Sequence, residues 1–133
     1  MISLDTNIVV RFLVNDDKKQ AAAVKKIFSE AEKNGETFLI TAPVLLELIY
    51  VLNSVYKYSR TEIIQALNAL TMMPVLEFEK YQAVQNLVSQ APEVKIELED
   101  MFIGLTSLES GCTTTLTFDK KAAKSDLFEL LRT

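Results

Sequence analysis

The sequence alternates short apolar runs with longer segments in which apolar side chains recur every three or four residues. The short runs predict buried strands, and the periodic segments predict amphipathic helices. Strands are expected at 1–4, 37–40, 75–78 and 112–117, and residues 126–131 form either an edge strand or a last helical turn. Helices are expected at 8–14, 17–34, 43–56, 59–73, 79–90 and 98–109.

Several helix boundaries carry their own sequence signals. Asn34 and Gly35 are typical of a helix end, and Pro43 suits the first turn of the next helix. Ser59 followed three residues later by Glu62 is a capping box, which predicts a helix start. The helix that follows Pro43 is apolar on nearly every side, so one small core is not expected to cover it, and this favours a partner subunit.

Strands that alternate with helices imply an α/β fold with right-handed crossovers. We expect a short, mostly parallel sheet of four or five strands covered by helices, giving three α/β/α layers. The chain shows no linker, internal repeat or low-complexity tract. Residues 1–133 are therefore expected to form a single domain, a size that can bury a substantial core.

Composition narrows the chemistry. With 49% apolar and 24% charged residues the chain suits a globular domain, and no apolar run approaches the length of a membrane span. A cytoplasmic protein with no membrane contact is expected. The chain has no histidine and one cysteine, Cys112, which excludes the usual zinc sites, histidine acid–base chemistry and an internal disulfide. The net charge of -4 argues against a dedicated nucleic-acid binder but permits a local basic patch.

Four acids are expected at one edge of the sheet. Asp5 and Asp119 each follow a strand, and parallel strands place their carboxyl ends together. Glu47 and Asp100 are expected in the first turns of covering helices, whose amino ends lie at that same edge. Like charges about 4 Å apart repel by roughly 4 kcal/mol at an effective dielectric of 20, so such a group calls for protons or cations. Oxygen donors without histidine favour Mg²⁺, which would support hydrolysis of phosphodiesters.

Each acid also has a purely structural explanation. The Asp5-Thr6-Asn7 trio could cap a helix, since all three residue types are good N-caps. Glu47 could be a solvated acid near a helix start, and Asp119 could cap the turn at Lys120.

The motifs Leu4-Asp5-Thr6-Asn7, Leu46-Glu47-Leu48, Asp100-Met101-Phe102-Ile103-Gly104 and Thr117-Phe118-Asp119 resemble the acidic motifs of PIN-domain ribonucleases. The similarity covers essentially the whole chain and is closest to the VapC group of toxin ribonucleases from type II toxin–antitoxin pairs. The resemblance implies a PIN-like domain with Mg²⁺- or Mn²⁺-dependent endoribonuclease activity on RNA. It further implies a homodimer that a cognate antitoxin inhibits.

The resemblance also assigns roles to residues. Asp5 and Asp100 would be the principal metal ligands, and Glu47 and Asp119 would complete the catalytic pocket. Thr6, Asn7 and Thr117 would position phosphate, ligand or water. The family often has Ala before the third acid, where this chain has Glu99, and Glu97 is also near. Asp100 is preferred as the third acid because Gly104, one turn on, leaves room above it.

Basic residues remain ambiguous at this stage. Arg11 could contact phosphate or pair with an acid. A second set could line an RNA path or form an ordinary wet surface: Lys57, Arg60, Lys120, Lys121 and Lys124.

Two other functions are compatible with the sequence. Asp5 could be the nucleophile of an aspartyl-phosphate phosphotransferase or phosphatase, although such enzymes have a second Asp where this chain has Asn7. The chain could also be a non-catalytic binding module that retains the acidic pocket.

Overall fold

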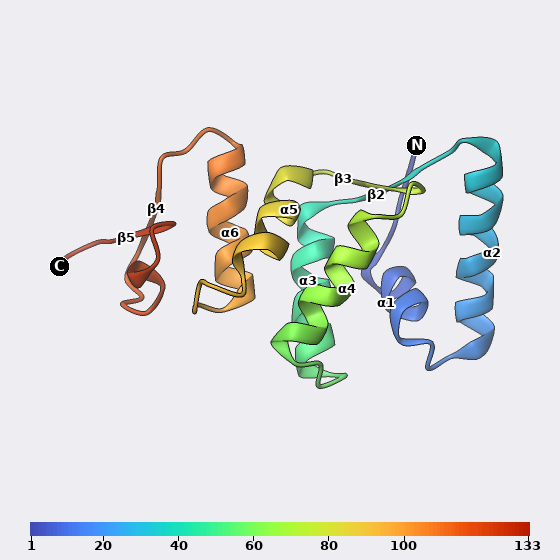
Figure 1. The fold of residues 1–133 in the computed structure, drawn as a ribbon, viewed down its shortest axis with the longest axis horizontal. Coiled ribbons are helices and arrows are strands. Elements are labelled where there is room, and N and C mark those ends of the chain that lie inside the picture. The colour runs from blue at the N-terminus through green and yellow to red at the C-terminus, as the bar shows by residue number, and fades with distance from the viewer.

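The computed structural model describes residues 1–133 and contains the expected alternation of strands and helices (Figure 1). The strands are β1 (Ile2–Ser3), β2 (Phe38–Ile40), β3 (Leu76–Phe78), β4 (Thr115–Thr117) and β5 (Phe128–Leu130). The helices are α1 (Thr6–Val14), α2 (Lys18–Asn34), α3 (Ala42–Ser54), α4 (Arg60–Thr71), α5 (Tyr81–Gln90) and α6 (Leu98–Glu109), with a short 3₁₀ turn at Ala122–Lys124. The α/β architecture with parallel strands is confirmed, and the tail forms a strand, β5.

The five strands are hydrogen-bonded in two parallel groups. One sheet has the order β1-β2-β3, with Ile2 opposite Phe38 and Phe38 opposite Leu76. The other contains only β4 and β5, with Thr115 opposite Phe128. Figure 1 shows β4 and β5 at one end of the molecule, with α6 between them and the remaining elements. The strand count agrees with expectation, and the division into two sheets is a feature that the apolar runs did not predict.

The first strand is less buried than its apolar residues suggested. Met1 is 80% exposed and Ile2 is 66% exposed, and only Leu4, just past the strand, lies in the core. The reason is topological, because β1 pairs with β2 alone and forms the outer strand of its sheet. A two-residue outer strand offers few positions that neighbours can cover on both faces.

Helix boundaries follow the local signals with two informative differences. The capping box is present, with Glu62 N–H donating to Ser59 Oγ and Ser59 N–H donating to Glu62 Oε1. Helix α1 begins at Thr6 rather than at residue 8, because Asp5 is the N-cap. Helix α3 begins at Ala42, so Glu47 is in its second turn and the expectation of a first-turn position is wrong.

Helix α3 lies at the centre of the core. Leu45, Leu48, Ile49 and Leu52 are fully buried by other parts of the same chain, so more of this helix is covered than its composition suggested. The rest of its apolar surface is concentrated at Tyr50, which is 58% exposed, and at Val55 just past its end, which is 62% exposed. None of the helices has the length and apolar character needed to cross a bilayer.

Candidate active site

Asp100 has the most distinctive electrostatic environment among the predicted site residues. It lies in the first turn of α6 and its side chain is partly buried. Burial, followed by the negative charges of Asp119 and Glu97, raises its pKa above the usual value of 3.8, and the ammonium of Lys121 opposes this rise. A bound cation would offset the repulsion that the neighbouring negative charges exert on the Asp100 carboxylate.

Asp119 reaches this locus from the loop after β4. Its Oδ1 accepts hydrogen bonds from the backbone N–H of Lys121 at 2.9 Å and of Ala122 at 3.4 Å. Its own N–H donates to Thr117 Oγ1 at 3.0 Å. The carboxylate of Asp119 therefore caps its own turn, as the structural explanation for this residue predicted. That turn also fixes where the charge lies, and Thr117 acts by holding the turn in place.

Glu97 and Lys121 complete the surroundings of Asp100. Lys121 Nζ lies 3.5 Å from Glu97 Oε1, and the two side chains are 64% and 68% exposed. Glu97 immediately precedes α6, one turn before Asp100. The sequence drew attention to Glu97 because of its nearness to the third acid, but no local pattern indicated that Lys121, far along the chain, would pair with it.

The polar trio after β1 takes up the N-cap geometry. Asp5 Oδ1 accepts a hydrogen bond from Thr6 N–H at 2.7 Å. Asp5 and Asn7 are exposed, whereas Thr6 is the one polar residue that is buried, at 3% exposure. Asp5 and Asn7 are thus accessible at the carboxyl end of β1, whereas Thr6 has almost no exposed surface.

Glu47 lies in a different surface hollow. It lines a depression of about 400 Å³ together with Pro43, Leu46, Tyr50 and residues of α6 that include Glu99 and Ile103. Neither Glu47 nor Asp5 is among the charges that shift the pKa of Asp100. The structure thus brings Asp100 and Asp119 together, and Glu47 lies beside Glu99 instead.

Arg11 is held by neighbouring side chains. Its Nε–H donates to Gln20 Oε1 at 2.6 Å, and its Nη1 lies 3.2 Å from Tyr56 Oη and 3.6 Å from Asp16 Oδ1. The Tyr56 hydroxyl in turn donates to Asp16 Oδ2 at 2.9 Å. Of the two interpretations of Arg11, the structure shows pairing with an acid.

Gly104 does not open space above Asp100. A Cβ at this position would lie 2.9 Å from Leu127 Cβ and 3.2 Å from Phe128 Cε2. The missing side chain therefore lets the segment that leads into β5 pack against α6. That packing brings the loop that carries Asp119 close to the first turn of α6.

No three carboxylates are grouped closely enough to form a ready metal site. The reason is visible at two of them, since Asp119 faces its own backbone and Glu97 faces Lys121. The chemistry of the donors still fits a hard divalent cation, because they are all carboxylates and their mutual repulsion is incompletely balanced. Binding would require the free oxygens of Asp119 and Glu97 to turn toward Asp100.

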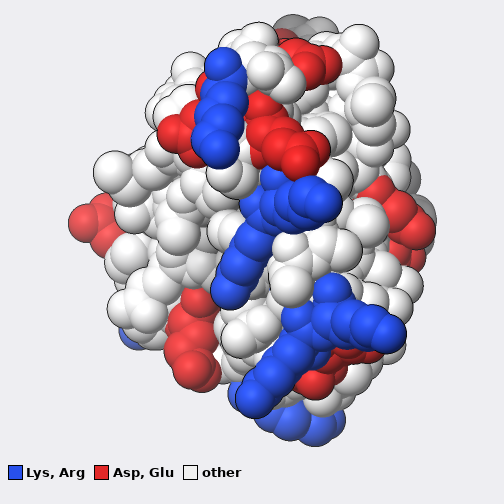
Figure 2. All heavy atoms as spheres, turned by 90° about the vertical axis from the view of Figure 1, so that its right-hand side faces the viewer, with Lys and Arg blue, Asp and Glu red and all other residues white.

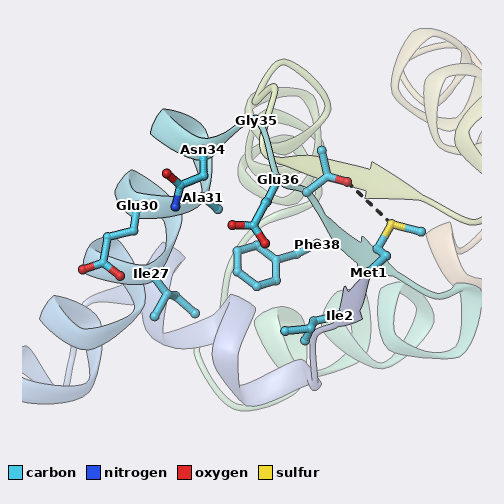
Figure 3. Close-up of a pocket in the computed structure, with 10 residues that line it drawn as sticks. Met1, Ile2, Ile27, Glu30, Ala31, Asn34, Gly35, Glu36 and Phe38 are labelled. Atoms are coloured by element: carbon cyan, nitrogen blue, oxygen red, sulfur yellow. Dashed lines mark hydrogen bonds between the residues drawn. The ribbon is translucent and has the colours of Figure 1, made fainter.

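Other surface features lie away from these acids. A hollow of about 430 Å³ is lined by residues around the starts of β1 and β2, among them Ile2, Phe38, Glu30 and Glu36. Figure 3 shows these side chains. The hollow lies at the amino ends of β1 and β2, whereas Asp5 follows the carboxyl end of β1. Figure 2 shows Lys and Arg side chains scattered with Asp and Glu across the end of the molecule formed by α2. That end is opposite the one formed by α6, β4 and β5 in Figure 1.

The PIN domain profile matches residues 2–126, which covers nearly the entire chain, and this protein belongs to the PIN-domain family. The chain is also similar to a VapC ribonuclease of Aquifex aeolicus (strain VF5), with 28% identity over 67 residues. That match covers 50% of this chain and 49% of the relative, so it spans about half the length of each protein.

Proposed function

We propose that this protein is an endoribonuclease that hydrolyses RNA phosphodiester bonds and acts as the toxin of a toxin–antitoxin pair. Family membership and the similarity to a VapC ribonuclease support the class of activity. The observation that carries the proposal to particular residues is the meeting of the Asp119 turn with the start of α6, where Lys121 Nζ lies 3.5 Å from Glu97 Oε1 and Asp100 is in the first turn. The raised pKa of Asp100, caused by burial and by the negative charges of Asp119 and Glu97, agrees with this geometry.

Asp5, Asp100, Asp119 and Glu47 would be the ligands of Mg²⁺ or Mn²⁺, with Glu97 as an additional candidate. Asp100 and Asp119 already act on each other, whereas Glu47 would have to reach the ion from the neighbouring hollow that it shares with Glu99. When bound, such an ion supplies an activated water and offsets the charge that develops on the phosphate oxygens. The side chains have separate tasks. Thr117 fixes the Asp119 turn, and Asn7 offers an exposed amide to a phosphate oxygen.

The proposed protein partners follow from the same similarity to a toxin ribonuclease. A cognate antitoxin would inhibit the enzyme in the cytoplasm, and two copies of the chain would form a homodimer. The exposed apolar side chains of Tyr50 on α3 and Ile103 on α6, with the partly buried Leu46 between Pro43 and Tyr50 in the same hollow, support the presence of a protein partner.

The direct test is cleavage of end-labelled RNA by purified protein in Mg²⁺, in Mn²⁺ and in chelator. We expect cleavage with metal and none with chelator, and growth arrest on expression that the product of a neighbouring small gene relieves. Trapping with beryllium fluoride tests the aspartyl-phosphate alternative, in which Asp5 would be modified. Absence of both cleavage and metal binding would leave the non-catalytic binding module.

A further inference from the structure

Arg60 joins the start of α4 to the connection that leads from α5 into α6. It is the first residue of α4, and a capping box fixes this end of the helix. Its guanidinium donates to the carbonyl oxygens of Ile96 at 2.6 Å, of Val94 at 2.6 Å and of Ala91 at 3.0 Å. The cation of Arg60 is thus used inside the protein, in contrast to the RNA-path interpretation of its sequence position.

No backbone N–H satisfies these three carbonyls. They lie between the end of α5 and the start of α6, and Ala91 and Ile96 are buried. The first turn of α6 has no side-chain cap either, because Glu97 at the N-cap position makes no such hydrogen bond. Carbonyl groups that are shielded from water are costly to leave unpaired, so Arg60 stabilises the present shape of the connection.

The same guanidinium reaches α6 itself. Its Nη2 lies 3.5 Å from Met101 Sδ, and Met101 is fully buried directly after Asp100. On the other side, Ile96 comes directly before Glu97. The contacts of Arg60 therefore lie on both sides of the segment that carries two of the acids, and a planar guanidinium holds several partners in a fixed relative geometry.

Arg60 does not act on the Asp100 carboxylate through its charge. The charged groups that shift the pKa of Asp100 are Asp119, Glu97 and Lys121, and Arg60 is not one of them. The influence of Arg60 on the acids therefore passes through the backbone that it holds.

We propose that Arg60 is a positioning residue of the candidate active site. By holding the connection at 91–97, it sets the first turn of α6 against the Asp119 turn and keeps Asp100 and Glu97 where one cation can reach them together with Asp119. The inference rests on the proposed function, because the acids that Arg60 positions are those of that activity. A displacement of about 1 Å can reduce a reaction rate by about 100-fold, so loss of this support should be visible in catalysis.

The test compares Arg60→Met with Arg11→Met. Both arginines are half-buried and use their guanidinium inside the protein, so the two variants lose the same charge and similar hydrogen bonds. Cleavage of labelled RNA in Mn²⁺ is measured over a range of RNA concentrations, at a temperature where circular dichroism shows both variants folded. Arg60→Met should lower kcat by about 10- to 100-fold, the range for residues that orient metal ligands, and leave KM close to that of the wild type. Arg11→Met should change neither quantity.

Metal binding without RNA supplies a readout that does not depend on cleavage. Isothermal titration with Mn²⁺ should give a Kd that is higher by about 10- to 100-fold in Arg60→Met and unchanged in Arg11→Met. If Arg60→Met does not fold, Arg60→Lys carries the same comparison against Arg11→Lys, because lysine keeps the charge and lacks the planar fork.

A folded Arg60→Met variant with wild-type kcat and wild-type Mn²⁺ affinity would overturn the inference. A raised KM with normal kcat would also overturn it, because Arg60 would then bind RNA directly. The two proposals fail separately. Cleavage that is insensitive to the Arg60 variants leaves the ribonuclease intact and removes the positioning role. Weaker Mn²⁺ binding in the Arg60 variants, without cleavage by the wild type in any metal, removes the ribonuclease and leaves the positioning role.

Discussion

The two ends of the molecule use charged side chains in opposite ways. At the α1–α2 end, Arg11 is surrounded by Asp16, Gln20 and Tyr56, and each member of the network has a partner of suitable charge or hydrogen-bonding type. At the α6 end, Asp100 has Asp119 and Glu97 as its charged neighbours, with only Lys121 to oppose them. One set of charges is balanced and the other is not.

This difference separates charges that hold the fold from charges available to a ligand. In the Arg11 network the cation already has an acid beside it, so a new anionic partner would compete with Asp16 for the guanidinium. In a group of like charges, a bound cation reduces the repulsion between the carboxylates. The carboxylates that destabilise the metal-free fold are therefore the ones that would bind the metal. The Arg11 network and the Asp100 cluster can therefore be distinguished experimentally by what each contributes.

The largest effect is expected from Asp100→Asn, which removes a proposed ligand at nearly constant shape. RNA cleavage should fall by at least about 100-fold, the upper range for disturbing groups around a catalytic metal. Single-turnover cleavage of labelled RNA measures the change. The matched control is Asp16→Asn, which makes the same change in the Arg11 network and should leave cleavage unaltered. Equal losses of cleavage in both variants would contradict the proposed difference between the Asp100 cluster and the Arg11 network.

Arg11→Met should lower stability and leave cleavage unaltered. The free energy of unfolding should fall by about 1–3 kcal/mol, because Asp16, Gln20 and Tyr56 lose their shared partner. Urea unfolding monitored by circular dichroism measures it. Lys121→Met, which breaks only an exposed pair, should cost at most about 1 kcal/mol. An Arg11 variant of normal stability that binds RNA weakly would restore the phosphate-binding interpretation of this residue.

Metal should stabilise the wild-type protein through the Asp100 cluster. A cation at ten times its Kd raises the free energy of unfolding by about 1.4 kcal/mol, which appears as a higher melting temperature in Mg²⁺ than in chelator. Asp16→Asn should keep this increase and Asp100→Asn should lose most of it. A full increase in the Asp100 variant would place the cation elsewhere.

The smallest expected effect is a dependence of stability on pH in chelator. Because the pKa of Asp100 is raised in the folded protein, its ionisation destabilises the fold as pH increases from the usual value of 3.8. Asp100→Asn, which cannot ionise, should melt above the wild type at neutral pH, and the difference should vanish below pH 3.8. Thermal scans from acid to neutral pH measure the effect, and a lower melting point of the variant at neutral pH would contradict it.

Much of the architecture was predictable because its causes are local. The apolar period located all six helices, and the Ser59–Glu62 capping box and Gly35 marked the ends of two of them. Asp100 lies in the first turn of α6, as expected. Glu47 does not lie in the first turn of α3, because the helix already begins at Ala42. Proline at an early position is compatible with more than one starting residue.

The sequence by itself determined where the chain is helical, which acids follow strands, and the absence of histidine chemistry. Only the tertiary structure decided that β4 pairs with β5 apart from the other three strands, and that Gly104 makes room for Leu127. It also decided that Lys121 and Glu97 are partners and that Arg60 is used inside the protein. Backbone periodicity records which residues are buried along one segment, whereas edge pairing and charge pairing depend on which distant segments meet.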